Sequence, residues 1–156
     1  LKLRKLIIDD IHSLVKYANN KKISDQIINI PHPYGEPDAT YRIAYVNQGF
    51  LNKSRFVFAI ADILSNDFIG EISLNLQSNS AQAEIGYWIA EPFWNKGFAI
   101  EAIKEVIKFG LEKLKLTSIY ATCNQENIGS SLVLLKNGFV KMESISRIHT
   151  YKITKI

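Results

Sequence analysis

Apolar and polar residues follow two different periods along this chain. Alternation with a period of two is typical of β-strands, whereas recurrence at three and four residues is typical of amphipathic helices. Apolar or alternating segments predict strands over residues 1–6, 55–62, 68–76, 81–90, 118–123, 139–142 and 148–153. Spacing at three and four predicts helices over about residues 11–18, 38–50 and 98–114, and one more that ends near residue 138.

Residues suited to helix ends support these boundaries. Asp9 and Asp10 precede the first helix and Asp38 precedes the second, where a carboxylate can accept the free N–H groups of the first turn. Gly138 follows the last helix and suits the left-handed backbone that often ends one. Residues 31–38, which contain three prolines, predict an ordered loop, because proline restricts its own backbone and that of the preceding residue.

The order of elements predicts a single domain over residues 1–156 with a mixed α/β layer structure. Short turns separate the three strands between residues 55 and 90, which favours an antiparallel meander. The strand–helix–strand unit of residues 85–123 predicts a crossover between two parallel strands, because a helix can return the chain to the same end of the sheet.

Composition and charge exclude some classes of protein. Hydrophobic residues are 47% of the chain and charged residues 22%, which is typical of a soluble globular protein. No apolar run approaches the ~18 residues that span a bilayer, and no segment typical of a signal peptide opens the chain. The net charge of +4 is scattered, whereas nucleic-acid binders usually show a dense basic stripe. We therefore expect a cytoplasmic protein without a membrane or nucleic-acid partner.

The cysteine and histidine residues indicate neither a disulfide nor a metal site. Cys123 is the single cysteine, and its place after an apolar run predicts a packed strand residue. His12, His32 and His149 are dispersed and lack the spacing of zinc ligands.

Residues 90–102 carry the strongest chemical signal. A strand ends near Ala90, a loop holds Lys96 and Gly97, and a long helix begins near Phe98. The free N–H groups and dipole of a helix N-terminus attract anions, and Gly97 lets a phosphate approach the backbone. An ordinary strand-to-helix connection explains the same pattern, because one glycine matches neither a Walker loop nor the dinucleotide fingerprint.

Residues 83–102 also resemble the central motif of the GNAT acetyltransferases. That family's loop follows the pattern Gln/Arg-x-x-Gly-x-Gly/Ala, and the matching positions here are Trp94, Gly97 and Ala99. Trp94 departs from Gln or Arg, and the aromatic version resembles the ribosomal-protein-alanine acetyltransferase (Rim-type) branch.

A second motif supports the same resemblance. Asn127 and Ser130 followed by Gly138-Phe139 resemble the family's Asn-x-x-Ser/Ala helix that ends in Gly-Phe, at the same spacing. The first four residues and the loop of residues 31–38 also look like the Rim-type branch, so that the resemblance covers nearly the whole chain.

The resemblance implies a GNAT-like fold and an acetyl-CoA cleft. The expected fold is a central mixed, mostly antiparallel sheet flanked by helices, in which two splayed strands form the cleft. Backbone groups of Trp88 and Ile89 would contact pantetheine and the thioester, the loop would hold the pyrophosphate, and the Asn127 side chain would bond pantetheine. The implied acetyl-CoA-binding residues are Trp88, Ile89, Asn95, Lys96, Gly97, Phe98, Ala99, Asn127 and Ser130. No metal or other cofactor is implied.

The resemblance also suggests catalytic residues. Glu84 is a candidate general base acting through water, as a matching Glu does in some relatives, and it is equally a solvated carboxylate; Glu71 is a rival. Many relatives place a tyrosine acid four residues before the Gly of Gly-Phe, but Leu134 stands there in this chain. Ser130 is the candidate acid in its place, with helix capping as its alternative role, and Tyr120 is another donor.

The implied activity is transfer of an acetyl group from acetyl-CoA to a primary amine, either a protein N-terminus or a small amine. His32, Tyr34 and Glu71 are expected to line the acceptor site. Two alternatives remain open, because function depends on the site and not on the fold. The first is a non-catalytic acyl-CoA-binding module, since the usual acid is missing, and the second is a protein-interaction domain.

Overall fold

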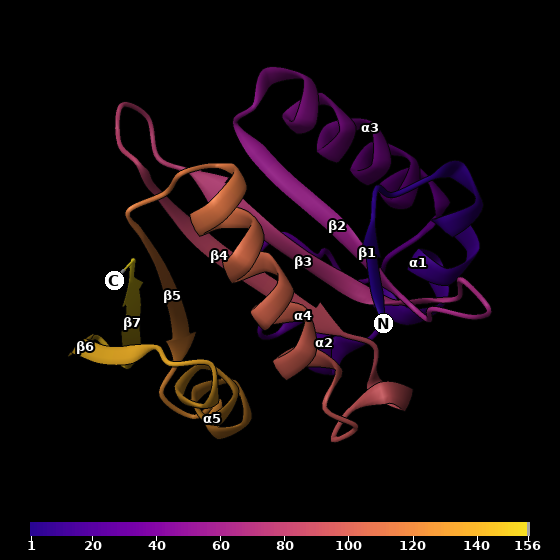
Figure 1. Ribbon diagram of the computed structural model, residues 1–156. Coiled ribbons are helices and arrows are strands. Elements are labelled where there is room, and N and C mark those ends of the chain that lie inside the picture. Colours follow the sequence, from indigo (N-terminus) through magenta and orange to yellow (C-terminus); the bar gives the residue numbers. More distant parts are fainter. Residues whose placement is uncertain (156) are drawn as a thin grey trace.

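A seven-stranded sheet with helices packed against it forms the computed structural model, which describes residues 1–155 (Figure 1). The strands are β1 (Lys2–Arg4), β2 (Arg55–Ala61), β3 (Phe68–Leu76), β4 (Gln82–Ile89), β5 (Ser118–Asn124), β6 (Val140–Ile145) and β7 (Ile148–Thr154). The α-helices are α1 (Ile11–Ala18), α2 (Lys21–Ser24), α3 (Glu36–Asn52), α4 (Phe98–Lys108) and α5 (Ile128–Lys136). Single-turn helices cover Ile8–Asp10 (η1) and Glu91–Phe93 (η2), and α4 continues as a π-helix over Phe109–Lys113 (η3).

The strands lie in the order β1-β2-β3-β4-β5-β7-β6. Neighbouring strands are antiparallel except β4 and β5, which are parallel and are connected through α4. The predicted meander, the parallel crossover and the mixed, mostly antiparallel sheet are confirmed. Ile156 of the predicted domain lies outside the described residues.

Two apolar layers cover the two faces of the sheet, because successive strand residues point to opposite sides. On one face, Ile85 and Ile89 of β4 pack with Ile103 and Val106 of α4. On the other face, Trp88 of β4 belongs to the layer that contains the buried residues of α1 and α3. The apolar faces predicted for α1 and α4 are therefore buried against the sheet.

The pairing of β4 with β5 is short. It extends from Gln82, opposite Ser118, to Glu84, opposite Tyr120. Beyond this point β4 continues to Ile89 and β5 continues to Asn124 without pairing to each other, and Figure 1 shows the two strands diverging. We call the space between these unpaired segments the β4–β5 gap, and it confirms the expected splay.

Two predicted helix caps are wrong in detail. Asp10 makes no side-chain cap at α1, and its Oδ2 accepts the N–H of Ile7 at 2.9 Å. Asp38 lies inside the first turn of α3, and its Oδ2 accepts the N–H of Gly35 at 2.8 Å. Each carboxylate thus bonds the N–H three residues before it, the backward contact of a capping box. As a result α3 begins at Glu36, earlier than predicted, whereas α1 begins at Ile11 as predicted, directly after η1. Gly138 has the expected left-handed backbone, with φ of 84°.

Two further features of the described residues concern function. Within residues 1–155, no helix has both the length and the hydropathy that crossing a membrane requires. In the same part of the chain, no group of three or more His, Cys, Asp or Glu side chains has an arrangement that could hold a metal ion.

Candidate active site

The loop before α4 ends in an open helix N-terminus. Gly97 precedes α4 with φ of 83°, and no side chain caps the first turn. A Cβ added to Gly97 would meet no atom within 4 Å, so the space above this residue is open. Asn95, also left-handed, and Lys96 are exposed beside it. The unpaired N–H groups at the start of α4 therefore form a site suited to an anion such as a pyrophosphate.

The backbone of β4 presents polar groups to the β4–β5 gap. Ala90 donates its N–H to Ile69 of β3 at 2.9 Å, and in an antiparallel pair alternate residues face the same neighbour. The N–H and C=O groups of Trp88 consequently face β3, whereas those of Tyr87 and Ile89 face the gap. Of the two residues expected to offer backbone groups there, Ile89 has the suitable orientation.

Trp94 fixes the loop to the end of β4. Its indole Nε1 donates to the carbonyl oxygen of Ile89 at 2.6 Å. This bond occupies the Ile89 carbonyl and leaves the Ile89 N–H on the gap side. The aromatic residue that departs from the Gln or Arg of the family pattern therefore has a structural role at the site.

The N-terminus of α5 lies on the other side of the gap. Asn127 caps α5 because its Oδ1 accepts the N–H of Ser130 at 3.0 Å, and its Nδ2 donates to the side chain of Gln26. Ser130 Oγ lies 2.5 Å from the hydroxyl oxygen of Tyr87 on β4. Burial raises the pKa of Tyr87 to about 12, so that its phenol stays protonated at neutral pH.

Glu84 lies at the point where β4 and β5 separate. It belongs to the last pair of β4 and β5, and its Oε1 accepts a hydrogen bond from the Thr122 hydroxyl at 3.1 Å. The side chain is half-buried, so water can reach it. Tyr120, the other donor considered, accepts a hydrogen bond from Gln77 at 2.7 Å.

Glu71 is buried in a network below α3. Its Oε2 lies 2.8 Å from Nη2 of Arg42 and 3.2 Å from the indole Nε1 of Trp88. The carboxylate is only 3% exposed, and burial of a charge requires partners of this kind. The Arg42 guanidinium and the Trp88 indole therefore hold the Glu71 carboxylate in a network that joins α3, β3 and β4.

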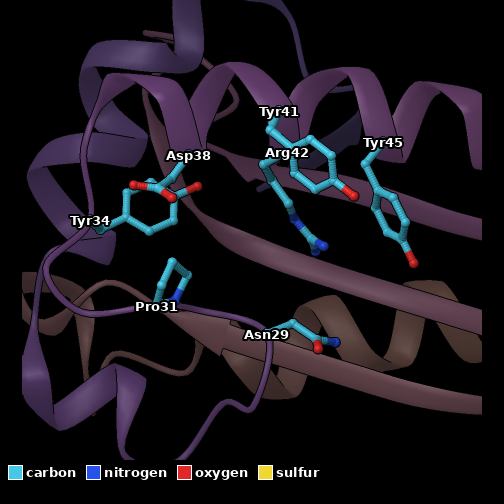
Figure 2. A pocket seen from close by; sticks show the side chains of 7 residues that line it. All are labelled: Asn29, Pro31, Tyr34, Asp38, Tyr41, Arg42 and Tyr45. Atoms are coloured by element: carbon cyan, nitrogen blue, oxygen red, sulfur yellow. The ribbon is translucent and has the colours of Figure 1, made fainter.

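A cavity of about 380 Å³ lies between α3 and the loop that precedes it (Figure 2). Its lining residues are Asn29, Pro31, Tyr34, Asp38, Tyr41, Arg42 and Tyr45. Figure 2 shows the Arg42 guanidinium and the rings of Tyr41 and Tyr45 extending from α3 toward the loop. Burial, reinforced by the charge of Glu71, raises the pKa of Tyr34.

The structure brings some of the expected acceptor residues together. Tyr34 lines the cavity. Glu71 is bonded to Arg42, another lining residue, whereas His32 is exposed and lies outside the lining. Sequence reasoning missed Arg42, Tyr87 and the contact role of Trp94. No local pattern distinguishes Arg42, because its partner Glu71 is 29 residues away on another element.

Comparison with known proteins agrees with this geometry. Residues 1–140 match a family described as an acetyltransferase (GNAT) domain. The uncharacterized N-acetyltransferase p20 of Bacillus licheniformis is 30% identical over 142 residues, which are 90% of this chain and 79% of that protein. The ribosomal-protein-serine acetyltransferase of Escherichia coli (strain K12) is 32% identical over 124 residues, 79% of this chain and 69% of the relative.

A solved structure shares the fold at low sequence identity. The spermidine N-acetyltransferase from Vibrio cholerae, in complex with CoA and spermine, has a TM-score of 0.81 and 22% identity. The similarity covers 98% of this chain and 94% of that protein. At this identity the likeness shows a common architecture, including the sheet and the order of its elements.

Proposed function

Because the chain belongs to the GNAT acetyltransferase family, whose members use acetyl-CoA as co-substrate, we propose that it transfers the acetyl group to a primary amine by direct attack on the thioester. The observation that carries this proposal is the β4–β5 gap beside the open N-terminus of α4. A gap in the sheet supplies unpaired backbone groups, and the helix terminus supplies an anion site at its edge.

The acetyl-CoA site is proposed to follow this geometry. The backbone from Asn95 to Ala99 would bind the pyrophosphate, with Lys96 adding a positive charge and Phe98 contributing its N–H. The open space above Gly97 supports this fit, because a side chain there would occupy the position of the phosphate. Asn127 already bonds Ser130 and Gln26, so contact of its amide with pantetheine would require exchange of the Gln26 bond.

The proposed chemistry needs a donor, a base and an acid. As the amine attacks, negative charge grows on the thioester oxygen, and the Ile89 N–H would stabilise it. Glu84 would accept the ammonium proton through a water molecule, and Ser130 would give its proton to the sulfur as the C–S bond breaks. The new C–N bond and the protonated thiol complete the exchange.

The acceptor is proposed to enter through the cavity at α3. Arg42 of the lining bonds Glu71, and Glu71 accepts the indole N–H of Trp88, which precedes Ile89 in β4. These bonds connect the cavity to the strand that borders the gap. Glu71 lies outside the lining and is paired with Arg42, so Asp38 is the lining carboxylate that would attract an ammonium group. One such carboxylate supports an acceptor with a single amine, such as a peptide N-terminus, over a polyamine.

A non-catalytic acyl-CoA-binding module is the second candidate. Its support is Leu134, which is fully buried at the position where many relatives carry a tyrosine acid. Both candidates require acetyl-CoA binding, and only the first requires turnover.

The test combines binding with turnover. Calorimetric titration with acetyl-CoA should show saturable binding, and a panel of peptides with free N-termini and small amines should then reveal turnover. Glu84→Gln should lower kcat by roughly 100-fold, the range of general-base catalysis, with unchanged acetyl-CoA affinity. Glu105→Gln, an exposed carboxylate on α4, serves as the matched control.

The outcomes separate the candidates. Binding without turnover of any amine would favour the module, and absence of binding in a folded sample would exclude both. Equal kcat for wild type and Glu84→Gln would remove Glu84 from the mechanism.

A further inference from the structure

Tyr87 makes a contact across the β4–β5 gap that the proposed chemistry does not yet use. Its ring lies on the α4 side of β4, among the residues packed on that apolar layer. Its hydroxyl oxygen lies 2.5 Å from Ser130 Oγ and 3.5 Å from the Ser130 carbonyl oxygen. The side chain thereby links an unpaired stretch of β4 to the first turn of α5.

Hydrogen bonds hold both the backbone and the hydroxyl group of Ser130. Asn127 accepts its backbone N–H, which fixes the position of the residue at the start of α5. Tyr87 fixes the hydroxyl group. A serine hydroxyl rotates freely unless a neighbour restrains it, and it has one proton and two lone pairs. A hydrogen bond donated to Oγ by Tyr87 leaves the serine proton free to point elsewhere.

The protonation of Tyr87 suits the role of a donor. Burial raises its pKa to about 12, so the phenol keeps its proton throughout the range in which an amine acceptor becomes neutral. Leu134 cannot perform the task, because its side chain is apolar and fully buried.

We propose that Tyr87 is the positioning residue for Ser130: it donates a hydrogen bond to Oγ and directs the serine proton toward the departing sulfur. This inference rests on the proposed function. As the C–S bond breaks, the Ser130 proton passes to sulfur, and the bond from Tyr87 stabilises the charge left on Oγ. The proton that Glu84 took from the ammonium group then returns through water to Ser130, which restores both groups. The phenol proton stays on Tyr87, so no oxidant or further reactant is needed.

The test uses Tyr87→Phe, which keeps the ring and removes the hydroxyl. With the best amine from the panel, this variant should lower kcat by roughly tenfold or more while leaving the acetyl-CoA Kd unchanged. Tyr17→Phe, which removes a hydroxyl from a ring that packs on Phe93, is the matched control and should keep the wild-type kcat.

The kcat of a double variant distinguishes a positioning role of Tyr87 from a role in packing alone. If Tyr87 acts through Ser130, adding Tyr87→Phe to Ser130→Ala should lower kcat by less than about twofold further, because the two groups act as one unit. Thermal unfolding of each variant confirms that the rates refer to folded protein.

Three results overturn the inference. They are a wild-type kcat for Tyr87→Phe, a loss of kcat matched by an equal loss of acetyl-CoA affinity, and multiplicative effects in the double variant. Failure of the proposed function is recognised separately, because the wild-type protein itself would then turn over no amine.

Discussion

At the scale of single residues, the Arg42–Glu71 ion pair sets the charge beside the cavity. Glu71 lies outside the lining of the cavity, and its charge is paired with that of Arg42, which does line it. Trp88 donates a further hydrogen bond to the same carboxylate. The same bonds attach α3 to β3 and β4. The pair therefore supports both the shape of the cavity and its charge.

Breaking this pair should be costly. Arg42→Met leaves the Glu71 carboxylate buried without its cation, and we expect a loss of about 3–5 kcal/mol in the free energy of unfolding. Denaturant titration followed by circular dichroism measures the change.

Two further variants make this prediction specific. Adding Glu71→Gln to Arg42→Met should recover most of the loss, because Gln keeps an oxygen for the Trp88 N–H and carries no charge. Arg147→Met breaks the exposed pair of Arg147 with Glu126 and should cost less than about 1 kcal/mol. Equal losses for Arg42→Met and Arg147→Met would contradict the assigned role of burial.

At the scale of elements, the start of α4 depends on one backbone conformation. Gly97 is left-handed and open above its Cα, whereas Gly138, at φ of 84°, ends α5 outside the proposed cofactor site. Asparagine accepts left-handed backbone better than other residues with a Cβ. The two glycines can therefore separate backbone strain from loss of space for a ligand.

We expect Gly97→Asn to weaken acetyl-CoA binding at least roughly tenfold, since its side chain would occupy the space of a phosphate. Gly138→Asn should keep the wild-type affinity, and both variants should remain folded because asparagine tolerates the conformation. Isothermal calorimetry gives the affinities. An unchanged Kd for Gly97→Asn would mean that the pyrophosphate binds elsewhere.

At the scale of the whole molecule, a short ladder joins two parts of the sheet. Strands β1 to β4 form one part and β5 to β7 form the other, and the parallel pairing stops at Glu84 and Tyr120. A molecule lying in the gap would contact both parts at once. Binding of acetyl-CoA should thus stabilise the fold as a unit.

Hydrogen exchange can measure this coupling. At acetyl-CoA concentrations 100 times the Kd, the global stability should rise by about 2.7 kcal/mol. The amides of Tyr87 and Ile89, which face the gap, should gain protection, and the amides on the free edge of β6 should gain no more than the global increment. Protection of β6 instead of β4 would contradict a ligand in the gap.

The sequence by itself determined the periods of the elements, the meander, the parallel crossover and the loop at Gly97. These features depend on residues close together in the chain, because side-chain period, turn residues and connection length act locally. The resemblance of the loop and of the Asn127 motif to known sequences then indicated the family.

Only the tertiary structure decided which polar groups meet. The last β4–β5 pair, the Arg42–Glu71 ion pair and the Tyr87–Ser130 bond each join residues distant in the sequence. Tyr87 and Ser130, for example, are 43 positions apart. The predicted cap at Asp10 shows the same effect. The Asp10 carboxylate accepts hydrogen bonds from Arg4 and from the N–H of Ile7, and not from the first turn of α1. A polar side chain binds the donors that the packed elements bring within about 3 Å, and a local pattern does not encode that placement.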